Sequence, residues 1–321
     1  MELAIEAIGV EKSYKTLSVL KGVDIRVPRG TVFALLGPNG AGKTTIVRIL
    51  STLTKMDRGR AAVAGFDVAR QRREVRRSIS LTGQYVAIDQ FQSGLENLQL
   101  LGRLSGLSGA DARRRADELL ERFNLTDAAA RRLSTYSGGM RRRLDLAASL
   151  VAQPSVVFLD EPTTGLDLNS RAELWNVIAD LAGAGVTVFL TTQYLEEADR
   201  LAGQVAVLNG GTIVAEGTPA SLKQQVAGQR LEIEFVDAAA YETAVSALGL
   251  NLLRSDFGER SISVPTDGSA GHVRSMLDEI DPGRTLVARF AVQQATLDDV
   301  FIALTASPAG ATETQKESVD V

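Results

Sequence analysis

The stretch GPNGAGKTT, residues 37–45, decides the fold of this chain. It satisfies the pattern G-x-x-x-x-G-K-[ST] and stands between the apolar run TVFALL at 31–36 and a segment with helical spacing. Gly40 and Gly42 admit backbone conformations closed to other residues, so successive N–H groups can point inward at the N-terminus of the following helix. The stretch therefore predicts a cradle for phosphate groups.

The chemistry of this loop indicates a nucleotide with Mg²⁺; that the nucleotide is ATP is implied by the family resemblance described below. We expect Lys43 to reach the terminal phosphates and the Thr44 hydroxyl to ligate Mg²⁺, a cation that prefers oxygen. A glycine-rich surface turn is the alternative interpretation. The loop residues expected to bind the nucleotide are Gly37, Pro38, Asn39, Gly40, Ala41, Gly42, Lys43, Thr44 and Thr45.

Two carboxylates, Asp160 and Glu161, follow the apolar run VVFLD at 156–160. Open α/β sheets bind their ligands at the carboxyl ends of the strands, where these two side chains are expected. Asp160 is expected to hold Mg²⁺ through a water, and Glu161 to orient or deprotonate the attacking water. A structural ion pair at the strand end is the alternative.

Up to about Ser221, short apolar runs alternate with longer amphipathic stretches, which is the pattern of an α/β domain. The runs at 31–36, 156–160 and 186–192 are continuously apolar, as in parallel strands buried on both faces. A hairpin is expected around Asn209, Gly210 and Gly211. Two helices are predicted with apolar faces formed by Ile46, Ile49, Leu50 and Leu53, and by Leu174, Val177, Ile178 and Leu181.

The chain is expected to hold two domains and a tail. The first spans residues 1–225 and contains a helical insert at about 94–150, where the strand signal vanishes. The second spans 229–305, and its order βαββαβ predicts a small α+β fold of ferredoxin-like type. The last residues, 306–321, are expected to be disordered.

Composition narrows the classes of partner and of chemistry. The net charge of −4 argues against a dedicated nucleic-acid binder. No cysteine and a single histidine, His272, leave oxygen as the ligand for any metal. Neither a secretory signal nor an apolar run of about 20 residues is present, so we expect the chain in the cytoplasm. The basic clusters at 70–77, 113–115 and 141–143 are interpreted as solvated helix faces.

A third motif, YSGGM at 136–140, narrows the class. Ser137 is expected to cap a helix whose apolar face is Leu144, Ala147, Ala148 and Val151, leaving hydroxyl and N–H groups free for an anion. With the two motifs above, this sequence resembles the ATP-binding subunits of ABC transporters. The resemblance implies a homodimer in which Ser137, Gly138 and Gly139 of one chain face the γ-phosphate held by the other. A plain helix cap is the alternative.

The resemblance implies further roles. Tyr14 matches the aromatic residue that stacks on adenine, although a core or surface tyrosine remains the alternative. Gln84 matches the glutamine that senses Mg²⁺ and water, and Asp167 matches the loop that touches the partner subunit. Residues from Tyr85 to Leu95 are expected to contact a separately encoded membrane permease, which places the chain peripherally on the cytoplasmic side of the membrane.

One position departs from the family pattern. Most members carry a histidine where LTTQYLEEAD places Gln193, and a glutamine amide donates a hydrogen bond but carries no proton near neutral pH. Glu161 is therefore the expected base, and Gln193 is expected to contact the γ-phosphate. ATP hydrolysis should not depend on histidine titration.

Over nearly its whole length the chain resembles the daunorubicin-resistance branch of bacterial drug exporters, whose LDDVFIALT ending it shares in pattern. The resemblance implies an ATPase that powers export of a hydrophobic drug or lipid-like compound. Two alternatives stay open. One is a soluble ABC-type ATPase acting on nucleic acid or ribosomes, and the other is a nucleotide sensor that does not hydrolyse ATP.

Overall fold

A computed structural model describes residues 2–82, 88–226, 229–248, 252–294, 296–297 and 299–301. The chain divides into two compact units, one of residues 1–219 and one that begins at Ala220. Among the described residues, no helix is long and apolar enough to cross a membrane. The first unit carries all three sequence motifs.

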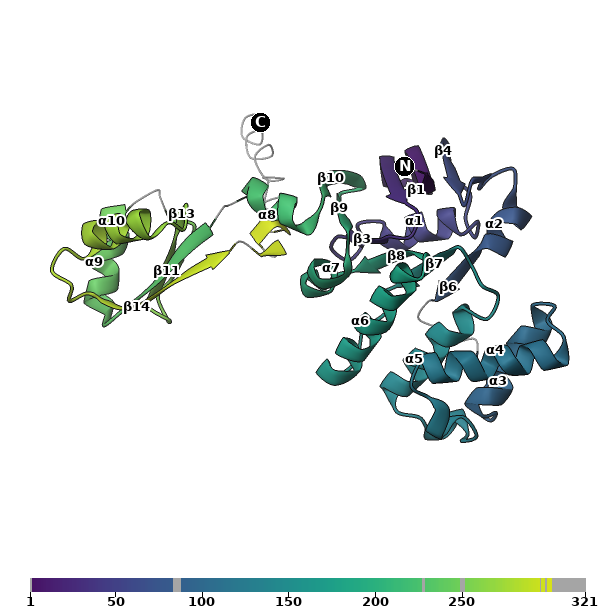
Figure 1. Cartoon of the computed structure of the whole chain (residues 1–321). Helices are drawn as coiled ribbons and strands as arrows, with labels where there is room; N and C mark the ends of the chain where they lie inside the picture. Colours follow the sequence, from purple (N-terminus) through teal and green to yellow (C-terminus); the bar gives the residue numbers. More distant parts are fainter. Residues whose placement is uncertain are drawn as a thin grey trace, which may run out of the picture. The chain divides into compact units, whose positions relative to one another are not determined.

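A six-stranded sheet forms the centre of the first unit (Figure 1). Its strand order is β10-β9-β3-β8-β7-β6, and every neighbouring pair is parallel except the β9–β10 hairpin. All of β3 and β8 is buried, which explains their continuous apolar sequence. The α/β fold and the hairpin predicted from the sequence are confirmed. The strands are β3 (Val32–Leu36), β6 (Ile79–Thr82), β7 (Val156–Asp160), β8 (Thr187–Thr192), β9 (Gln204–Asn209) and β10 (Thr212–Gly217).

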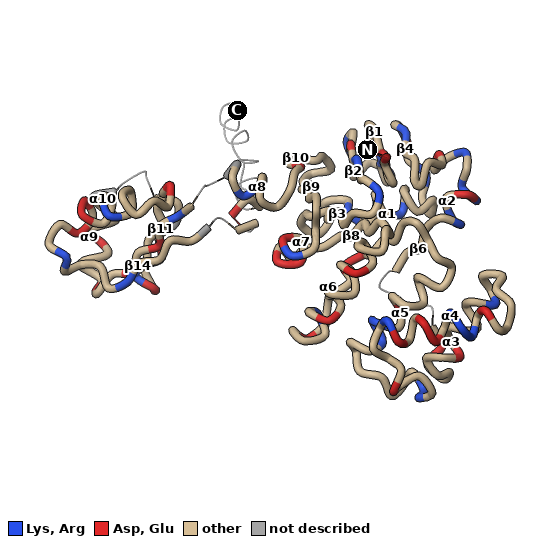
Figure 2. Tube along the Cα trace, viewed as in Figure 1, with Lys and Arg blue, Asp and Glu red and all other residues tan. Residues whose placement is uncertain are grey.

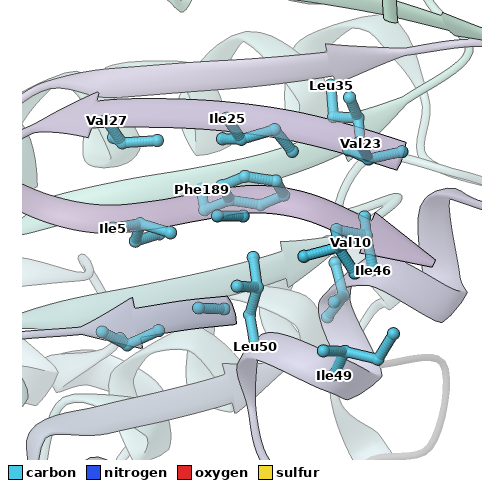
Figure 3. Packing of buried hydrophobic residues seen from close by; sticks show 14 of the residues in the cluster. Ile5, Val10, Val23, Ile25, Val27, Leu35, Ile46, Ile49, Leu50 and Phe189 are labelled. Carbon is cyan, nitrogen blue, oxygen red and sulfur yellow. The ribbon is translucent and has the colours of Figure 1, made fainter. Parts of the chain in front are cut away.

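A second, antiparallel sheet of order β2-β1-β4-β5 lies over this centre. Alternate residues of β2, Val23, Ile25 and Val27, are buried, whereas their neighbours face solvent. They pack in one apolar cluster with residues such as Phe189 of β8 and with helix α1 (Figure 3). The strands are β1 (Leu3–Tyr14), β2 (Leu17–Pro28), β4 (Arg58–Val63) and β5 (Phe66–Asp67).

The helices of this α/β body bury the faces predicted for them, with one exception. In α6 (Leu168–Gly183) all four predicted face residues are buried. Helix α1 (Lys43–Leu50) ends earlier than expected, so the prediction that Leu53 belongs to its buried face is wrong. Thr52, with φ 65°, turns the chain before that point, and Leu53 is exposed. The other helices are α2 (Arg72–Ser78) and α7 (Leu195–Leu201).

A helical insert occupies the region after β6. Ser93 caps α3 with a full capping box, and Ser108 caps α4. Basic and acidic residues are mixed along α4 (Figure 2). Arg113 and Arg114 pair with acidic residues three or four positions away. The insert comprises α3 (Gly94–Leu104), α4 (Gly109–Arg122), the 3₁₀ turns Thr126–Ala128 and Leu133–Thr135, and α5 (Gly138–Ser149).

The basic cluster at 141–143 departs from the prediction of a solvated helix face. Only Arg141 is exposed. The side chains of Arg142 and Arg143 are largely buried, because α5 packs against α3, α4 and α6. They pair with Asp145 and Glu173 respectively. That interpretation is therefore wrong for two of the three arginines.

The second unit has the order βαββαβ and an antiparallel sheet β12-β13-β11-β14, as in a ferredoxin-like fold. Leu231, Ile233 and Phe235 of β11 point into its core, where they pack with Tyr241 of α9. The α+β class predicted for this region is confirmed. The elements from residue 219 onward are α8 (Pro219–Val226), β11 (Gln229–Phe235), α9 (Ala238–Leu248), β12 (Arg254–Asp256), β13 (Ser261–Thr266), α10 (Ala270–Ile280) and β14 (Val287–Gln294).

Candidate functional site: a phosphate loop with a carboxylate pair

The glycine-rich loop connects the end of β3 to the start of α1, as its sequence predicts. Gly42 is the N-cap of α1 and has φ 110°, a conformation that side chains rarely adopt. A Cβ atom there would also lie 2.7 Å from Leu20 Cδ2. Both the backbone conformation and the close contact with β2 therefore require glycine at this point. The loop leaves the N–H groups at the start of α1 available to an anion.

Lys43 extends back over this loop. Its ammonium group donates hydrogen bonds to the carbonyl oxygens of Gly37, at 2.7 Å, and Pro38, at 3.2 Å. Only 5% of the residue is exposed, and this burial lowers the pKa of Lys43, while the nearby charges of Glu161 and Asp160 oppose the shift. The ammonium therefore stays beside the loop, where a terminal phosphate would be bound.

Asp160 and the Thr44 hydroxyl meet beside the loop. Thr44 Oγ1 donates to Asp160 Oδ2 at 3.2 Å, and Thr191 Oγ1 donates to Asp160 Oδ1 at 2.5 Å. The second contact exists because β7 and β8 are parallel neighbours in which Asp160 pairs with Thr191. A hydroxyl and a carboxylate oxygen this close together suit Mg²⁺, which takes oxygen ligands and retains several waters.

Glu161 leaves the strand in an unusual conformation. Its φ is 49°, in the left-handed region, and its N–H donates to Thr191 O at 3.0 Å. Its carboxylate is partly open to solvent and lies 3.9 Å from the Lys43 ammonium. That distance is too long for a hydrogen bond, and the hydrogen bond that the carboxylate accepts comes from the Thr164 hydroxyl, at 3.5 Å.

The YSGGM turn is also a packing element. Ser137 caps α5 by accepting the N–H of Met140 at 3.2 Å, as predicted. Tyr136 is buried, and its hydroxyl donates to Ala128 O at 2.7 Å. Asp167 caps α6 through the N–H and hydroxyl of Ser170. A Cβ atom on Gly139 would come 2.3 Å from Ser170 Oγ, so the turn packs against the start of α6.

This contact gives a first prediction. Gly139→Ala is expected to destabilise the protein by about 1–3 kcal/mol, because Ser170 and its bonds to Asp167 must move to admit a methyl group. Gly138→Ala is the matched control, because a Cβ atom there meets nothing within 4 Å. Denaturant unfolding of both variants measures the difference. Equal stability of the two variants would contradict the packing argument.

Two predicted site residues, Tyr14 and Gln193, make no hydrogen bond to the described residues of this cluster. Tyr14, at the end of β1, is 45% exposed, and the Lys12 ammonium lies 5.5 Å from its ring centre. Gln193 is exposed just after β8, two residues beyond Thr191. Gln84 lies outside the described residues.

Two residues that contact the site, Thr191 and Arg142, are not among those predicted from the sequence. Thr191 was not singled out, although the polar pair TT that ends the apolar run at 186–192 was a visible signal. Arg142 donates from Nε to the carbonyl of Pro162, the residue after Glu161, at 2.7 Å. No local sequence signal distinguished Arg142 from its neighbours.

Fold and site together define an ATPase of the phosphate-loop class. Residues 20–164 match the family model described as ABC transporter. The chain is 47% identical to the daunorubicin resistance ATP-binding protein DrrA3 of Streptomyces coeruleorubidus, over 95% of this chain and 96% of the relative. The chain belongs to the ATP-binding subunits of ABC transporters, and it is an ATP-binding ATPase.

Two further relatives are more distant. A Nod factor export ATP-binding protein I of Paraburkholderia xenovorans is 36% identical over 95% of this chain and 97% of its own. A solved structure of an ATP binding subunit of an ABC transporter is 27% identical, with a TM-score of 0.62 over 70% of this chain and 93% of that chain.

Proposed function

We propose that this chain powers an exporter of hydrophobic drugs or lipid-like compounds through a separately encoded membrane permease. The observation that carries the proposal is its similarity, over nearly its whole length, to a protein named for daunorubicin resistance. The Nod factor export relative supports the same direction of transport with a different cargo.

Within this function, the site residues divide the work of hydrolysis. The loop from Gly37 to Thr45, with Lys43, would bind the ATP phosphates. Thr44 and Asp160 would hold Mg²⁺, which supplies charge neutralisation at the phosphates when bound. Glu161 would take the proton of the attacking water, a role favoured by its partly exposed carboxylate beside Lys43.

Three further residues keep the roles that the family resemblance implies. Gln193 would contact the γ-phosphate, and its position after β8, next to the strand that carries Asp160, supports that role. Tyr14 would stack on adenine, for which its exposed ring is available. Gln84 would respond to Mg²⁺ and water.

Two copies would close head to tail on ATP, so that Ser137, Gly138 and Gly139 of one chain complete the site of the other. The separation of the signature and the phosphate loop onto different parts of one unit supports this arrangement. Asp167 would meet the partner at the same interface, because it is tied to the signature turn through Ser170.

The permease would dock on the segment from Tyr85 to Leu95, which places the chain at the cytoplasmic face of the membrane. Phe91, in the described part of that segment, supports this site because it is 83% exposed. An aromatic side chain so exposed suits a partner surface better than water.

Drug efflux tests the proposal. Cells that express the partner permease are loaded with daunorubicin, and its fluorescence is followed with and without this chain. We expect rapid loss of cell fluorescence only when both proteins are present. Efflux at the same rate from cells with the permease alone would contradict the proposed function.

A further inference from the structure

A buried pair of charges lies between the signature helix α5 and the loop that follows Glu161. Arg142 lies two residues beyond the signature, and its side chain is 14% exposed. Its Nη1 donates to Asp145 Oδ2 at 3.3 Å, and its Nε donates to Pro162 O at 2.7 Å. One guanidinium therefore joins the signature helix to the main chain after Glu161.

That main chain needs external support. A residue other than glycine with positive φ carries strain of about 1–2 kcal/mol, and Glu161 has φ 49°. On one side its own N–H is held by Thr191 O, and on the other the Pro162 carbonyl is held by Arg142. The first bond fixes the peptide group that precedes Glu161, and the second fixes the Pro162–Thr163 peptide group, one residue further along the chain. Because the proline ring restricts φ of Pro162, fixing that group also limits the directions that the Glu161 side chain can take.

The charges around Arg142 come from three different elements. Asp145 belongs to α5 itself, Glu197 to α7 and Asp160 to β7, and all three carboxylates favour the charged guanidinium in its buried position. Asp145 is the one that makes a direct bond to it. If Asp145 were neutral, the attraction of Arg142 to Glu197 and Asp160 would no longer be balanced by Asp145. The guanidinium would then shift toward those two carboxylates.

We propose that Arg142 is a positioning residue for hydrolysis, oriented by Asp145, and that it couples the signature turn to the Glu161 carboxylate of the same chain. The proposal rests on the proposed role of Glu161 as base. Because Arg142 lies on the first turns of α5, a displacement of the signature turn shifts the Pro162 carbonyl and with it Glu161. Engagement of the signature by a nucleotide would thus align the base.

Asp145 makes this coupling sensitive to pH. Burial raises the pKa of Asp145 to about 6, with Arg142 as the charge that opposes the shift. Above that pH the carboxylate is charged and holds the guanidinium, and below it the carboxyl is protonated and the hold weakens. Burial also raises the pKa of Glu197. Mutation of Asp145 is therefore needed to tell which of the two carboxyl groups causes a change in activity with pH.

The test is the pH profile of ATP hydrolysis by the full chain with its permease, from pH 5.5 to 8. For the wild type we expect kcat to fall about fourfold between pH 7.5 and 5.5, with KM for MgATP nearly constant. Asp145→Asn is expected to have a low kcat at every pH, close to the kcat of the wild type at pH 5.5. Its kcat should not fall further between pH 7.5 and 5.5, and this decrease at low pH is called the acid fall below.

Variants of the arginine separate positioning from folding. Arg142→Gln is expected to lower kcat by about tenfold or more with KM within about twofold, and Arg142→Lys to recover part of that loss because it keeps one charged donor. Arg141→Gln is the matched control, since Arg141 is exposed and bonds to Ser134 O. Thermal unfolding of each variant identifies losses that come from misfolding.

An acid fall that persists in Asp145→Asn, or wild-type turnover in a folded Arg142→Gln, would overturn the proposal. The variant Glu161→Gln shows whether the coupling through Arg142 and Asp145 is wrong or whether the proposed role of Glu161 as base is wrong. Normal turnover in Glu161→Gln would remove Glu161 as base, whereas the Asp145→Asn profile still reports whether Asp145 causes the acid fall.

Discussion

Glu161→Gln is expected to lower kcat for ATP hydrolysis by about 10²- to 10⁴-fold, the usual contribution of a general base. Glutamine has nearly the same shape, so the turn at φ 49° and the Glu161 N–H bond to Thr191 O are preserved. Only the ability to accept the proton is lost. ATP affinity should change little, because the Lys43 ammonium keeps its hydrogen bond to the loop. Only the negative charge of the carboxylate 3.9 Å from that ammonium is lost.

Phosphate release and nucleotide binding measure these two effects separately. An ATP-bound dimer is also expected to accumulate in size-exclusion chromatography, because closure proceeds while hydrolysis does not. Glu121→Gln, an exposed position on α4, serves as the control for the loss of one negative charge. Turnover within twofold of the wild type in Glu161→Gln would exclude Glu161 as the base.

Lys43→Ala is expected to weaken ATP binding by about 10- to 10²-fold and to bring hydrolysis below detection. Charge-assisted hydrogen bonds contribute about 1.5–3 kcal/mol each, and the ammonium is the cation on the phosphate side of the loop. Lys43→Ala should lower kcat in addition to ATP affinity, because the charge that develops at the γ-phosphate is no longer stabilised. Calorimetric titration with ATP and a phosphate-release assay measure the two effects.

Lys55→Ala is the matched control, because Lys55 is an exposed lysine in the loop after α1. It should bind and hydrolyse ATP as the wild type does. If a folded Lys43→Ala variant kept wild-type affinity and turnover, the proposed phosphate site would be wrong.

Most of this site could be predicted from the sequence because each motif lies next to the strand or helix that positions it. A glycine-rich loop between a buried strand and a helix admits few conformations, and the ends of parallel strands meet at one edge of a sheet. Thr44 and Asp160 were therefore assigned to one place, and their side chains lie within hydrogen-bond distance. The strand order that brings Thr191 to Asp160 was not predictable in the same way, since it depends on pairing between distant segments.

The arginines at 141–143 show where such prediction fails. Helical periodicity tells which residues share a face, but it does not tell which other elements cover that face. Three consecutive arginines necessarily point in different directions around a helix, so a single interpretation for all three was wrong. The partners of Arg142, an acidic residue one turn away and a proline carbonyl after the next strand, are visible only in the fold.

The two hydrogen bonds that Lys43 makes to Gly37 and Pro38 have a consequence for the thermodynamics of nucleotide binding. These two carbonyl groups already accept hydrogen bonds from the Lys43 ammonium. When ATP binds, its phosphate oxygens replace existing hydrogen-bond acceptors and do not satisfy an unpaired ammonium. The enthalpy of binding is therefore a difference between two satisfied states. The protein's own carbonyl groups thus spare Lys43 the cost of an unpaired buried charge.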